Sequence, residues 1–217
     1  MDLSFLKNLK IELEPVVEKA GEIIMEVYES DHAINEKSDG SPVTEADTKS
    51  EKIIVPAIKR ICPNIPIISE ENSDSHKFNV DGPFFLVDPL DGTKEFLKKD
   101  GKGAFTINIA LIKNDVPVFG MVHAPALKRS FSGIVGDGSV EKNDTQSTVI
   151  TISESKKLNI IAVASASHRD EKTNKWLESN KIERTISVGS SLKFCLLATG
   201  EADVYPRFAP TMEWDTA

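Results

Sequence analysis

The sequence predicts a mixed protein in which an α+β part is followed by an α/β part. Two helical patterns come first, apolar strands dominate the middle of the chain, and strands alternate with helices beyond residue 160. The chain has 217 residues, of which 40% are hydrophobic, and this is sufficient for two packed cores. The polar stretch 141–155 lacks a helical period, and we interpret it as a seam. We therefore expect an N-terminal domain over residues 1–145 and a C-terminal domain over residues 146–217.

Two helices are predicted in the first third of the chain. Apolar residues recur at helical spacing over residues 15–29, and Pro15 suits the first turn of a helix. A second helix is expected to begin at Thr44, because Thr44 and Asp47 have the spacing of a capping box. Pro56 is expected to kink this helix or to end it early. Short strands are expected at residues 33–37 and 65–68.

The rest of the chain is predicted from apolar alternation and from turn signals. Apolar residues alternate along 105–112, and Gly136 and Gly138 indicate a hairpin. In the middle of the chain, strands are expected at residues 84–87, 105–112, 116–123 and 129–135. Beyond the seam, strands are expected at residues 160–164, 182–188 and 203–205, and helices at residues 169–180 and 190–199.

The charge and cysteine content exclude several classes of protein. The 34 acidic and 26 basic residues give a net charge of −8, which disfavours general binding to nucleic-acid polymers. A small phosphorylated ligand is still compatible with this charge where metal ions reverse the local sign. Cys62 and Cys195 have no metal-like or disulfide-like spacing, and no apolar run reaches membrane-spanning length. Charges interrupt any signal-peptide core in residues 1–13, so we expect a protein of the reducing cytoplasm.

The stretch 84–93 concentrates the polar chemistry. An apolar strand is followed by Asp88 and Asp91, and burying two carboxylates there is unfavourable unless something compensates their charge. Gly92 and Thr93 can open a helix whose backbone N–H groups face an anion. Taken alone, such a stretch is more often a turn with capping aspartates. The other carboxylates of the chain favour a divalent-metal site that meets a phosphate.

Those other carboxylates also follow predicted strands. Glu70 and Glu71 come directly after residues 65–68, and Asp215 comes after residues 203–205. Since the strand ends of one sheet can meet in one crevice, these groups are expected to converge with the two aspartates of the central stretch. The resulting donor set is all oxygen, which suits Mg²⁺ or Mn²⁺ rather than Zn²⁺.

The same blocks resemble the metal motif of the inositol monophosphatase superfamily, a group of Mg²⁺-dependent, lithium-sensitive phosphatases. In chain order, the blocks are Glu70-Glu71, Asp88-Pro89-Leu90-Asp91-Gly92-Thr93 and Trp214-Asp215. Their flanks are similar to those of the 3′(2′),5′-bisphosphate nucleotidase branch. These flanks are Lys94-Glu95-Phe96 and residues 41–44, 189–195 and 205–208. The resemblance covers nearly the whole chain and implies a layered α-β-α-β-α fold.

The resemblance implies roles for individual residues. The expected metal ligands are Glu70, Asp88, the carbonyl oxygen of Leu90, Asp91 and, at a second position, Asp215. Gly92 and Thr93 would hold the scissile phosphate through backbone N–H groups. Thr93, hydrogen-bonded to Asp47, would orient the attacking water together with Glu70. The expected substrate contacts are Glu70, Leu90, Asp91, Gly92, Thr93, His168, Ser190, Lys193, Arg207 and Asp215.

Three of those contacts are expected to lie away from the metals. A second phosphate needs positive charge, and Lys193 and Arg207 are the candidates for supplying it, although a surface lysine or arginine is more often solvated. His168 is a weaker candidate, with a hydrogen-bonded loop residue or a stack for the base as its alternatives.

The sequence departs from the family pattern in two places. Ala166 stands in Ser165-Ala166-Ser167-His168 where the family usually has an arginine, which removes one polar contact near the nucleotide. The sequence ends at Ala217, whereas family members continue with a helix and further strands. We therefore expect either a truncated fragment or a chain whose remaining part is not included in this sequence. If that helix is absent, Asp215 is expected to lie on a frayed end with its metal position empty.

The function that these features favour is removal of the 3′-phosphate of 3′-phosphoadenosine 5′-phosphate to give AMP, in sulfur assimilation and nucleotide recycling. Mg²⁺ is the expected cofactor and Mn²⁺ a substitute, with Li⁺ and Ca²⁺ inhibitory. The alternatives are an inositol monophosphatase and a catalytically silent nucleotide- or cation-binding fragment. Lys94-Glu95-Phe96 favours the nucleotidase, and the presence of both Thr93 and Asp47 argues against a silent protein. A homodimer and a peripheral association with the inner membrane are left open.

Overall fold

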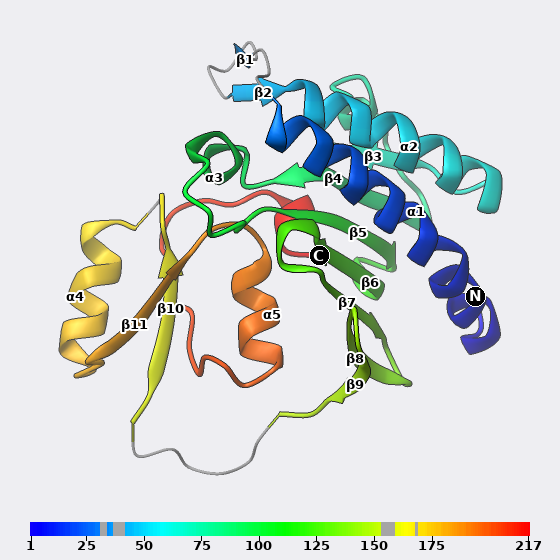
Figure 1. Ribbon diagram of the computed structural model, residues 1–217. Coiled ribbons are helices and arrows are strands. Elements are labelled where there is room, and N and C mark those ends of the chain that lie inside the picture. The colour runs from blue at the N-terminus through cyan, green and yellow to red at the C-terminus, as the bar shows by residue number, and fades with distance from the viewer. Residues whose placement is uncertain (31–33, 37–41, 153–158, 168) are drawn as a thin grey trace.

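The computed structural model describes residues 1–30, 34–36, 42–152, 159–167 and 169–217 (Figure 1). Its largest element is a seven-stranded sheet with strand order β3-β4-β5-β6-β7-β8-β9. β3 and β4 are parallel, and each later pair is antiparallel. The strands are β3 (Ile67–Ser69), β4 (Phe84–Asp91), β5 (Thr106–Lys113), β6 (Val116–Ala124), β7 (Arg129–Ile134), β8 (Gly138–Asn143) and β9 (Ser147–Ile150).

Five layers follow one another across the molecule (Figure 1). Helices α1 (Leu3–Glu29) and α2 (Glu45–Ile61) cover one face of the large sheet. On the other side, α5 (Leu192–Ala198) lies between this sheet and a parallel pair of strands, and α4 (Glu171–Ser179) lies beyond that pair. The pair consists of β10 (Ile161–Ser165) and β11 (Arg184–Val188). The expected α-β-α-β-α layering is therefore confirmed.

The remaining elements are short and lie between the layers. β1 (Ile34–Glu36) and β2 (Pro42–Thr44) form an antiparallel pair. α3 (Thr93–Lys98) follows β4 directly. Three single 3₁₀ turns complete the described chain, namely η1 (Ser75–Lys77), η2 (Pro125–Leu127) and η3 (Glu213–Asp215). Among the described helices, none has the length and apolar character needed to cross a membrane.

Both helix predictions around proline need correction. α1 begins at Leu3, where Asp2 accepts a hydrogen bond of 2.8 Å from the backbone N–H of Phe5, so Pro15 lies inside the helix and not in its first turn. α2 runs past Pro56 to Ile61, so the expected early end is wrong. In both cases a proline that costs one backbone hydrogen bond is outweighed by an apolar stripe that continues into the core on either side of it.

Two other segments differ from expectation. The end of β8 and the whole of β9 lie in the polar stretch 141–155, because pairing along a sheet edge does not need apolar side chains on both faces. The strand expected at residues 203–205 is a single bridge, in which Val204 pairs with Ala162. The division between residues 145 and 146 stays a prediction.

Candidate active site

The end of β4 places two aspartates at the edge of a fully buried strand. Phe85 and Val87 have no exposed surface, and the pairing of β4 with β5 shifts register between Asp88 and Asp91. Asp88 is 1% exposed, and its Oδ1 accepts the backbone N–H of Leu90 at 3.0 Å. Its Oδ2 is buried and has no hydrogen-bond partner in the described part of the chain. A buried carboxylate oxygen without a partner is unfavourable. Asp88 therefore calls for a proton or a positive charge beside this oxygen.

Asp215 approaches the same place from η3, far along the chain. Its Oδ2 accepts hydrogen bonds from Thr211 Oγ1 at 2.7 Å and from the backbone N–H of Met212 at 3.2 Å. One carboxylate oxygen from each of Asp88, Asp91 and Asp215 lies within 4.8 Å of the other two. Asp215 therefore lies in a hydrogen-bonded turn beside the aspartates of β4, and the expectation of a frayed end is wrong.

Crowding and burial change the pKa values of these carboxyls. Burial raises the pKa of Asp88 well above its usual range, and the charges of Glu70, Asp91 and Asp215 raise it further. Burial and the charge of Asp215 raise the pKa of Asp91 to about 7, against the opposing effect of Lys193. Without a cation, the cluster therefore holds protons near neutral pH. An ion of high charge density would replace those protons.

Asp91 is fixed by polar groups from two other elements. The backbone N–H of Ser191 donates to Asp91 Oδ2 at 2.5 Å, and Asn108 Nδ2 donates to the same oxygen at 3.4 Å. Ser191 Oγ in turn donates to Asn108 Oδ1 at 2.6 Å. Hydrogen bonds of this kind orient a carboxylate that serves as a ligand. The second half of the chain thus helps to aim a side chain of the first half.

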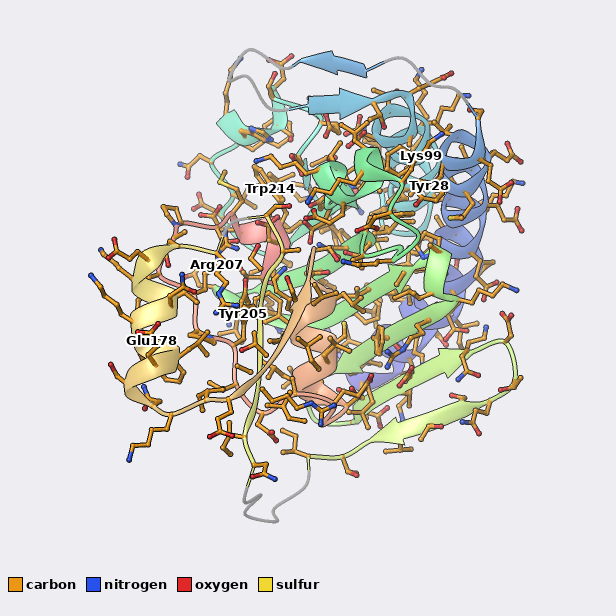
Figure 2. All side chains as sticks on the ribbon, turned by 60° about the vertical axis from the view of Figure 1, so that its left-hand side comes forward. Tyr28, Lys99, Glu178, Tyr205, Arg207 and Trp214 are labelled. Carbon is orange, nitrogen blue, oxygen red and sulfur yellow. The ribbon has the colours of Figure 1, made fainter. Side chains whose placement is uncertain are left out.

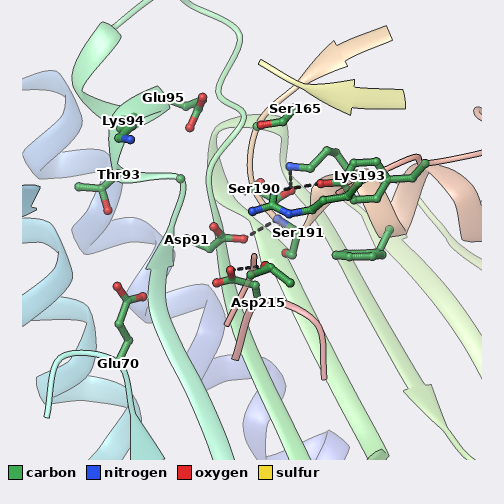
Figure 3. Close-up of a pocket in the computed structure, with 16 residues that line it drawn as sticks. Glu70, Asp91, Thr93, Lys94, Glu95, Ser165, Ser190, Ser191, Lys193 and Asp215 are labelled. Carbon is green, nitrogen blue, oxygen red and sulfur yellow. Dashed lines mark hydrogen bonds between the residues drawn. The ribbon is translucent and has the colours of Figure 1, made fainter. Parts of the chain in front are cut away.

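Glu70 enters the site from the loop after β3. Its backbone N–H donates to the carbonyl of Val87 at 3.0 Å, which continues the parallel pairing of β3 with β4 up to the acidic cluster. The side chain lines the same cleft as Asp91 and Asp215 (Figure 3). The ends of β3 and β4 therefore bring Glu70 and the two aspartates of β4 together, as the sequence predicts, whereas Asp215 joins them from η3 and not from a strand end of this sheet.

Thr93 and Asp47 connect the site to the start of α2. Asp47 is fully buried, and its Oδ2 accepts the backbone N–H of Thr44 at 2.7 Å and the hydroxyl of Thr44 at 2.6 Å. Its Oδ1 is 3.3 Å from Thr93 Oγ1, which is also 3.3 Å from the carbonyl oxygen of Leu90. Asp47 is therefore both the N3 residue of the capping box of α2, whose N-cap is Thr44, and a partner of Thr93.

The turn between β4 and α3 requires glycine. Gly92 has a φ of 89°, a left-handed conformation that L side chains rarely adopt. A Cβ atom added there would lie 3.0 Å from the carbonyl oxygen of Ala104 and 3.2 Å from Ser190 Cβ. Without a side chain, Gly92 can pack closely against Ala104 and Ser190. Gly92 and Thr93, at the start of α3, line the cleft, and the backbone N–H groups of this first turn can meet an anion there.

Comparison with known proteins identifies the family. The model of the inositol monophosphatase family matches residues 6–217. This chain belongs to the inositol monophosphatase family. It is 40% identical to the 3′(2′),5′-bisphosphate nucleotidase CysQ of Salmonella typhimurium over 201 residues, which are 91% of this chain and 80% of that protein. It is 41% identical to the protein of the same name from Buchnera aphidicola over 203 residues, 91% of this chain and 74% of that one.

Solved structures agree with this assignment. The crystal structure of CysQ from Bacteroides thetaiotaomicron superposes with a TM-score of 0.77 at 36% identity, covering 99% of this chain and 84% of that one. The suhB protein of Bartonella henselae also reaches a TM-score of 0.77, at 22% identity and over 97% of this chain and 81% of that chain, and this likeness shows the shared fold. The predicted family and its nucleotidase-like branch are confirmed.

In this member of the inositol monophosphatase family, the acidic cluster forms one end of a cleft of about 230 Å³ (Figure 3). Lys193 and Arg207 line the cleft as well. Lys193 is 4% exposed, its Nζ donates to the carbonyl of Ser190, and it lies 5.5 Å from the centre of the Tyr205 ring. Burial lowers the pKa of Lys193, and the charge of Asp91 opposes this effect.

Arg207 has only neutral partners among the described residues. Its guanidinium donates to the carbonyl oxygens of Ala209 at 3.3 Å and Pro210 at 2.6 Å, and to the hydroxyl of Tyr205 at 3.2 Å. Figure 2 shows Arg207 and Tyr205 together beside the β10–β11 layer. Lys193 and Arg207, two of the cations that line the cleft, thus hydrogen-bond only to neutral groups within the residues that the structure describes.

Almost all predicted site residues come together in this one place. His168 lies outside the described residues. Sequence reasoning missed Asn108, Ser191 and Thr211, which orient the aspartates. Asn108 could have been noticed in the sequence, because it is a polar residue within an apolar strand. In the structure its side chain is buried, with 6% of the residue exposed. Ser191 and Thr211 gave no such signal, since serine and threonine are common in turns.

Proposed function

We propose that this protein is a metal-dependent phosphatase that removes the 3′-phosphate of 3′-phosphoadenosine 5′-phosphate, giving AMP and inorganic phosphate. The observation that carries the proposal is a cleft with a crowded acidic cluster at one end and two cations with neutral partners at the other. The names of the CysQ relatives, which are bisphosphate nucleotidases, support the same substrate class.

The residues of the cluster fit a divalent cation. The donors are carboxylate oxygens, the buried Oδ2 of Asp88 lacks a partner, and the pKa values of Asp88 and Asp91 are raised. We propose Mg²⁺, with Mn²⁺ as a substitute, held by Glu70, Asp88, Asp91, Asp215 and the carbonyl of Leu90. Such ions, when bound, neutralise phosphate oxygens and lower the pKa of a bound water.

The protein's own groups then position the reactants. The water forms a bond to phosphorus and gives up a proton, the bond from phosphorus to the ribose O3′ breaks, and O3′ takes up a proton to become the 3′-hydroxyl of AMP. Thr93 Oγ1 can donate its single proton to only one of its two acceptors, Asp47 Oδ1 and the Leu90 carbonyl. If the Leu90 carbonyl is a ligand, the proton points to Asp47. The hydroxyl oxygen of Thr93 then accepts a hydrogen from the water and orients it.

Lys193 and Arg207 are proposed to bind the 5′-phosphate. Their partners in the described chain are carbonyl oxygens, a phenol and an aromatic ring, none of which neutralises a positive charge. An anionic group away from the metal end would meet both. Ser190, which has a φ of 51° and lines the cleft, would lie beside it. This arrangement distinguishes a bisphosphate from a monophosphate.

A panel of substrates tests the proposal. Phosphate release should be compared for 3′-phosphoadenosine 5′-phosphate, inositol 1-phosphate and fructose 1,6-bisphosphate, each with Mg²⁺. We expect the nucleotide to have the highest kcat/KM, and Li⁺ and Ca²⁺ to inhibit, since Ca²⁺ accepts a looser coordination that misplaces the water. Preference for inositol 1-phosphate would establish the alternative function. Undiminished turnover in EDTA would remove the metal from the reaction.

The thiols agree with a cytoplasmic enzyme. Cys62 and Cys195 are both free and buried. Burial raises the pKa of Cys195 to about 12, so this thiol is unreactive. Free thiols without disulfides are usual in a reducing compartment. A homodimer stays a prediction.

A further inference from the structure

We infer that His76 is a positioning residue for the metal centre, because it joins the segment that carries Glu70 to the segment that carries Asp215. The inference rests on the metal site of the proposed function. His76 lies in η1, outside the cleft, and it belongs to none of the motifs that define the family resemblance. It therefore acts through other residues.

At one end, His76 and its neighbour hold the peptide that precedes Glu70. His76 Nε2 lies 2.8 Å from the carbonyl oxygen of Ser69. Ser75, which is 1% exposed, accepts the backbone N–H of Ser69 at 3.0 Å through its Oγ. Ser69 Oγ donates to Glu51 Oε1 at 2.6 Å. The last residue of β3 is thus fixed at its N–H, carbonyl and side chain immediately before Glu70.

At the other end, His76 stacks on the residue that precedes Asp215. The imidazole and the indole of Trp214 are 5.0 Å apart between ring centres and inclined by 27°. Trp214 also packs against the small apolar cluster of Leu86, Ala110 and Ile112 on the sheet. Figure 2 shows Trp214 at this turn, above Arg207. The indole therefore contacts both the sheet and a ring from η1.

The main chain of Trp214 continues this connection into the site. Its carbonyl oxygen accepts a hydrogen bond of 3.4 Å from Asn108 Nδ2, the same amide nitrogen that donates to Asp91. A shift of Trp214 would move Asp215 and release Asn108 together. Ligand-orienting contacts of this kind typically change metal affinity by about 10–100-fold when they are lost.

Electrostatics explains why such a contact is useful. Glu70, Asp88, Asp91 and Asp215 repel one another in the absence of a cation, as the raised pKa of Asp88 shows. Repulsion would move apart the two segments that are not part of β4, namely those with Glu70 and Asp215. A stacking contact between the two aromatic rings opposes that movement.

Three variants and a control separate the contacts. His76→Ala removes the ring and the hydrogen bond, His76→Phe keeps a ring, and His76→Gln keeps a donor for the Ser69 carbonyl. The control is Lys77→Ala in the same turn, where Lys77 makes an exposed ion pair of 2.8 Å with Asp74. Mn²⁺ binding is measured by electron paramagnetic resonance without substrate, together with the Mg²⁺ dependence of phosphate release and the melting temperature.

We expect His76→Ala to bind Mn²⁺ about tenfold more weakly than the parent, and His76→Phe and His76→Gln, which each keep one of the two contacts, to bind it with intermediate affinity. Lys77→Ala should bind Mn²⁺ as the parent does. Turnover at saturating Mg²⁺ should stay close to that of the parent in all four. Parent-like Mn²⁺ affinity in His76→Ala would overturn the inference, even if its melting temperature fell, and so would full recovery by phenylalanine or by glutamine, because one contact alone would then suffice. A parent protein that binds Mn²⁺ but hydrolyses no substrate would overturn the proposed function alone.

Discussion

The two ends of the cleft handle buried charge in opposite ways. At the acidic end, Asp88, Asp91 and Asp215 crowd together, and one buried carboxylate oxygen has no partner among the described residues. In the rest of the cleft, Lys193 and Arg207 have carbonyl groups, a phenol and an aromatic ring as their contacts, and the charge of Asp91 reaches Lys193. One end concentrates like charges, and the other end solvates its charges with dipoles.

The difference indicates what each end is for. Crowded carboxylates are costly until a cation binds, so the acidic end is poised for a metal. Cations held by neutral dipoles are stable without a ligand and still attract an anion. A molecule with two phosphates can use both ends, one through the metal and one directly. The acidic end should therefore govern turnover, and the basic end should govern the choice of substrate.

Removing one charge from the acidic end should have the largest effect. Asp91→Asn keeps the shape of the side chain but weakens a ligand, and we expect kcat to fall by at least about 100-fold. The matched control is Asp137→Asn, at a surface aspartate that pairs with Lys7 at 2.7 Å. Steady-state phosphate release at saturating Mg²⁺ measures both. Near-normal turnover of Asp91→Asn would reduce this carboxylate to a turn residue.

The pair Thr93 and Asp47 lies at the acidic end but does not belong to the cluster. Thr93→Ala should lower kcat by about 100-fold with little change in KM, because its hydroxyl orients the water mainly in the transition state. Asp47→Asn should cause a similar loss, and the double variant little more, because the two residues act as one unit. Losses that multiply in the double variant would leave Asp47 only its role as the cap of α2.

At the basic end, the effect should appear in KM. Lys193→Met keeps the buried stem and removes the charge, and a charge-assisted phosphate contact is worth about 1.5–3 kcal/mol, or roughly ten- to a hundredfold in affinity. KM for the bisphosphate nucleotide should rise by about that factor, while hydrolysis of inositol 1-phosphate changes little. Lys175→Ala, which removes an exposed ion pair with Glu171, is the control. Equal losses of activity on both substrates would indicate that Lys193 supports the fold and does not bind the second phosphate.

The sequence revealed the charged residues of this cleft better than the groups that support them. Asp88, Asp91 and Asp215 were identifiable because several carboxylates follow predicted strands and because their sequence blocks resemble the family's metal motif, although one such stretch alone is more often a capped turn. Asn108 and Ser191, which fix Asp91, belong to residue types that occur in many settings, and their importance depends on contacts between distant segments. Contacts of this kind cannot be inferred from local patterns.

The fold shows the same division between local and distant information. The layered order followed from the family motifs, and most strands followed from apolar alternation. The start of α1 and the passage of α2 through Pro56 did not, because burial of residues such as Leu9, Leu13 and Ile58 outweighs the local preference of proline. The edge strand β9 was missed for a related reason, since its stability comes from pairing with β8.

The smallest expected effect concerns the stability of the metal-free protein. The pKa of Asp91 is raised to about 7 by burial and by Asp215, whereas the pKa of an aspartate in the unfolded chain is near its ordinary value of 3.8. Between these two values the folded protein binds more protons than the unfolded chain, so stability falls as pH rises from about 4 to about 7 and is then constant for this group. This loss of stability with rising pH comes from the crowded carboxylates at the acidic end of the cleft.

Melting temperatures in EDTA across this pH range measure the effect. For a protein of this size each kcal/mol corresponds to about 2–4 °C, so a decline of several degrees is expected for the parent. Asp91→Asn should show a smaller decline, because the titrating group is gone and repulsion with Asp215 is relieved. Lys193→Met should retain or steepen the parent's decline, since Lys193 opposes the shift at Asp91. A decline that is unchanged in Asp91→Asn would mean that the cost of crowded charge lies elsewhere in the molecule.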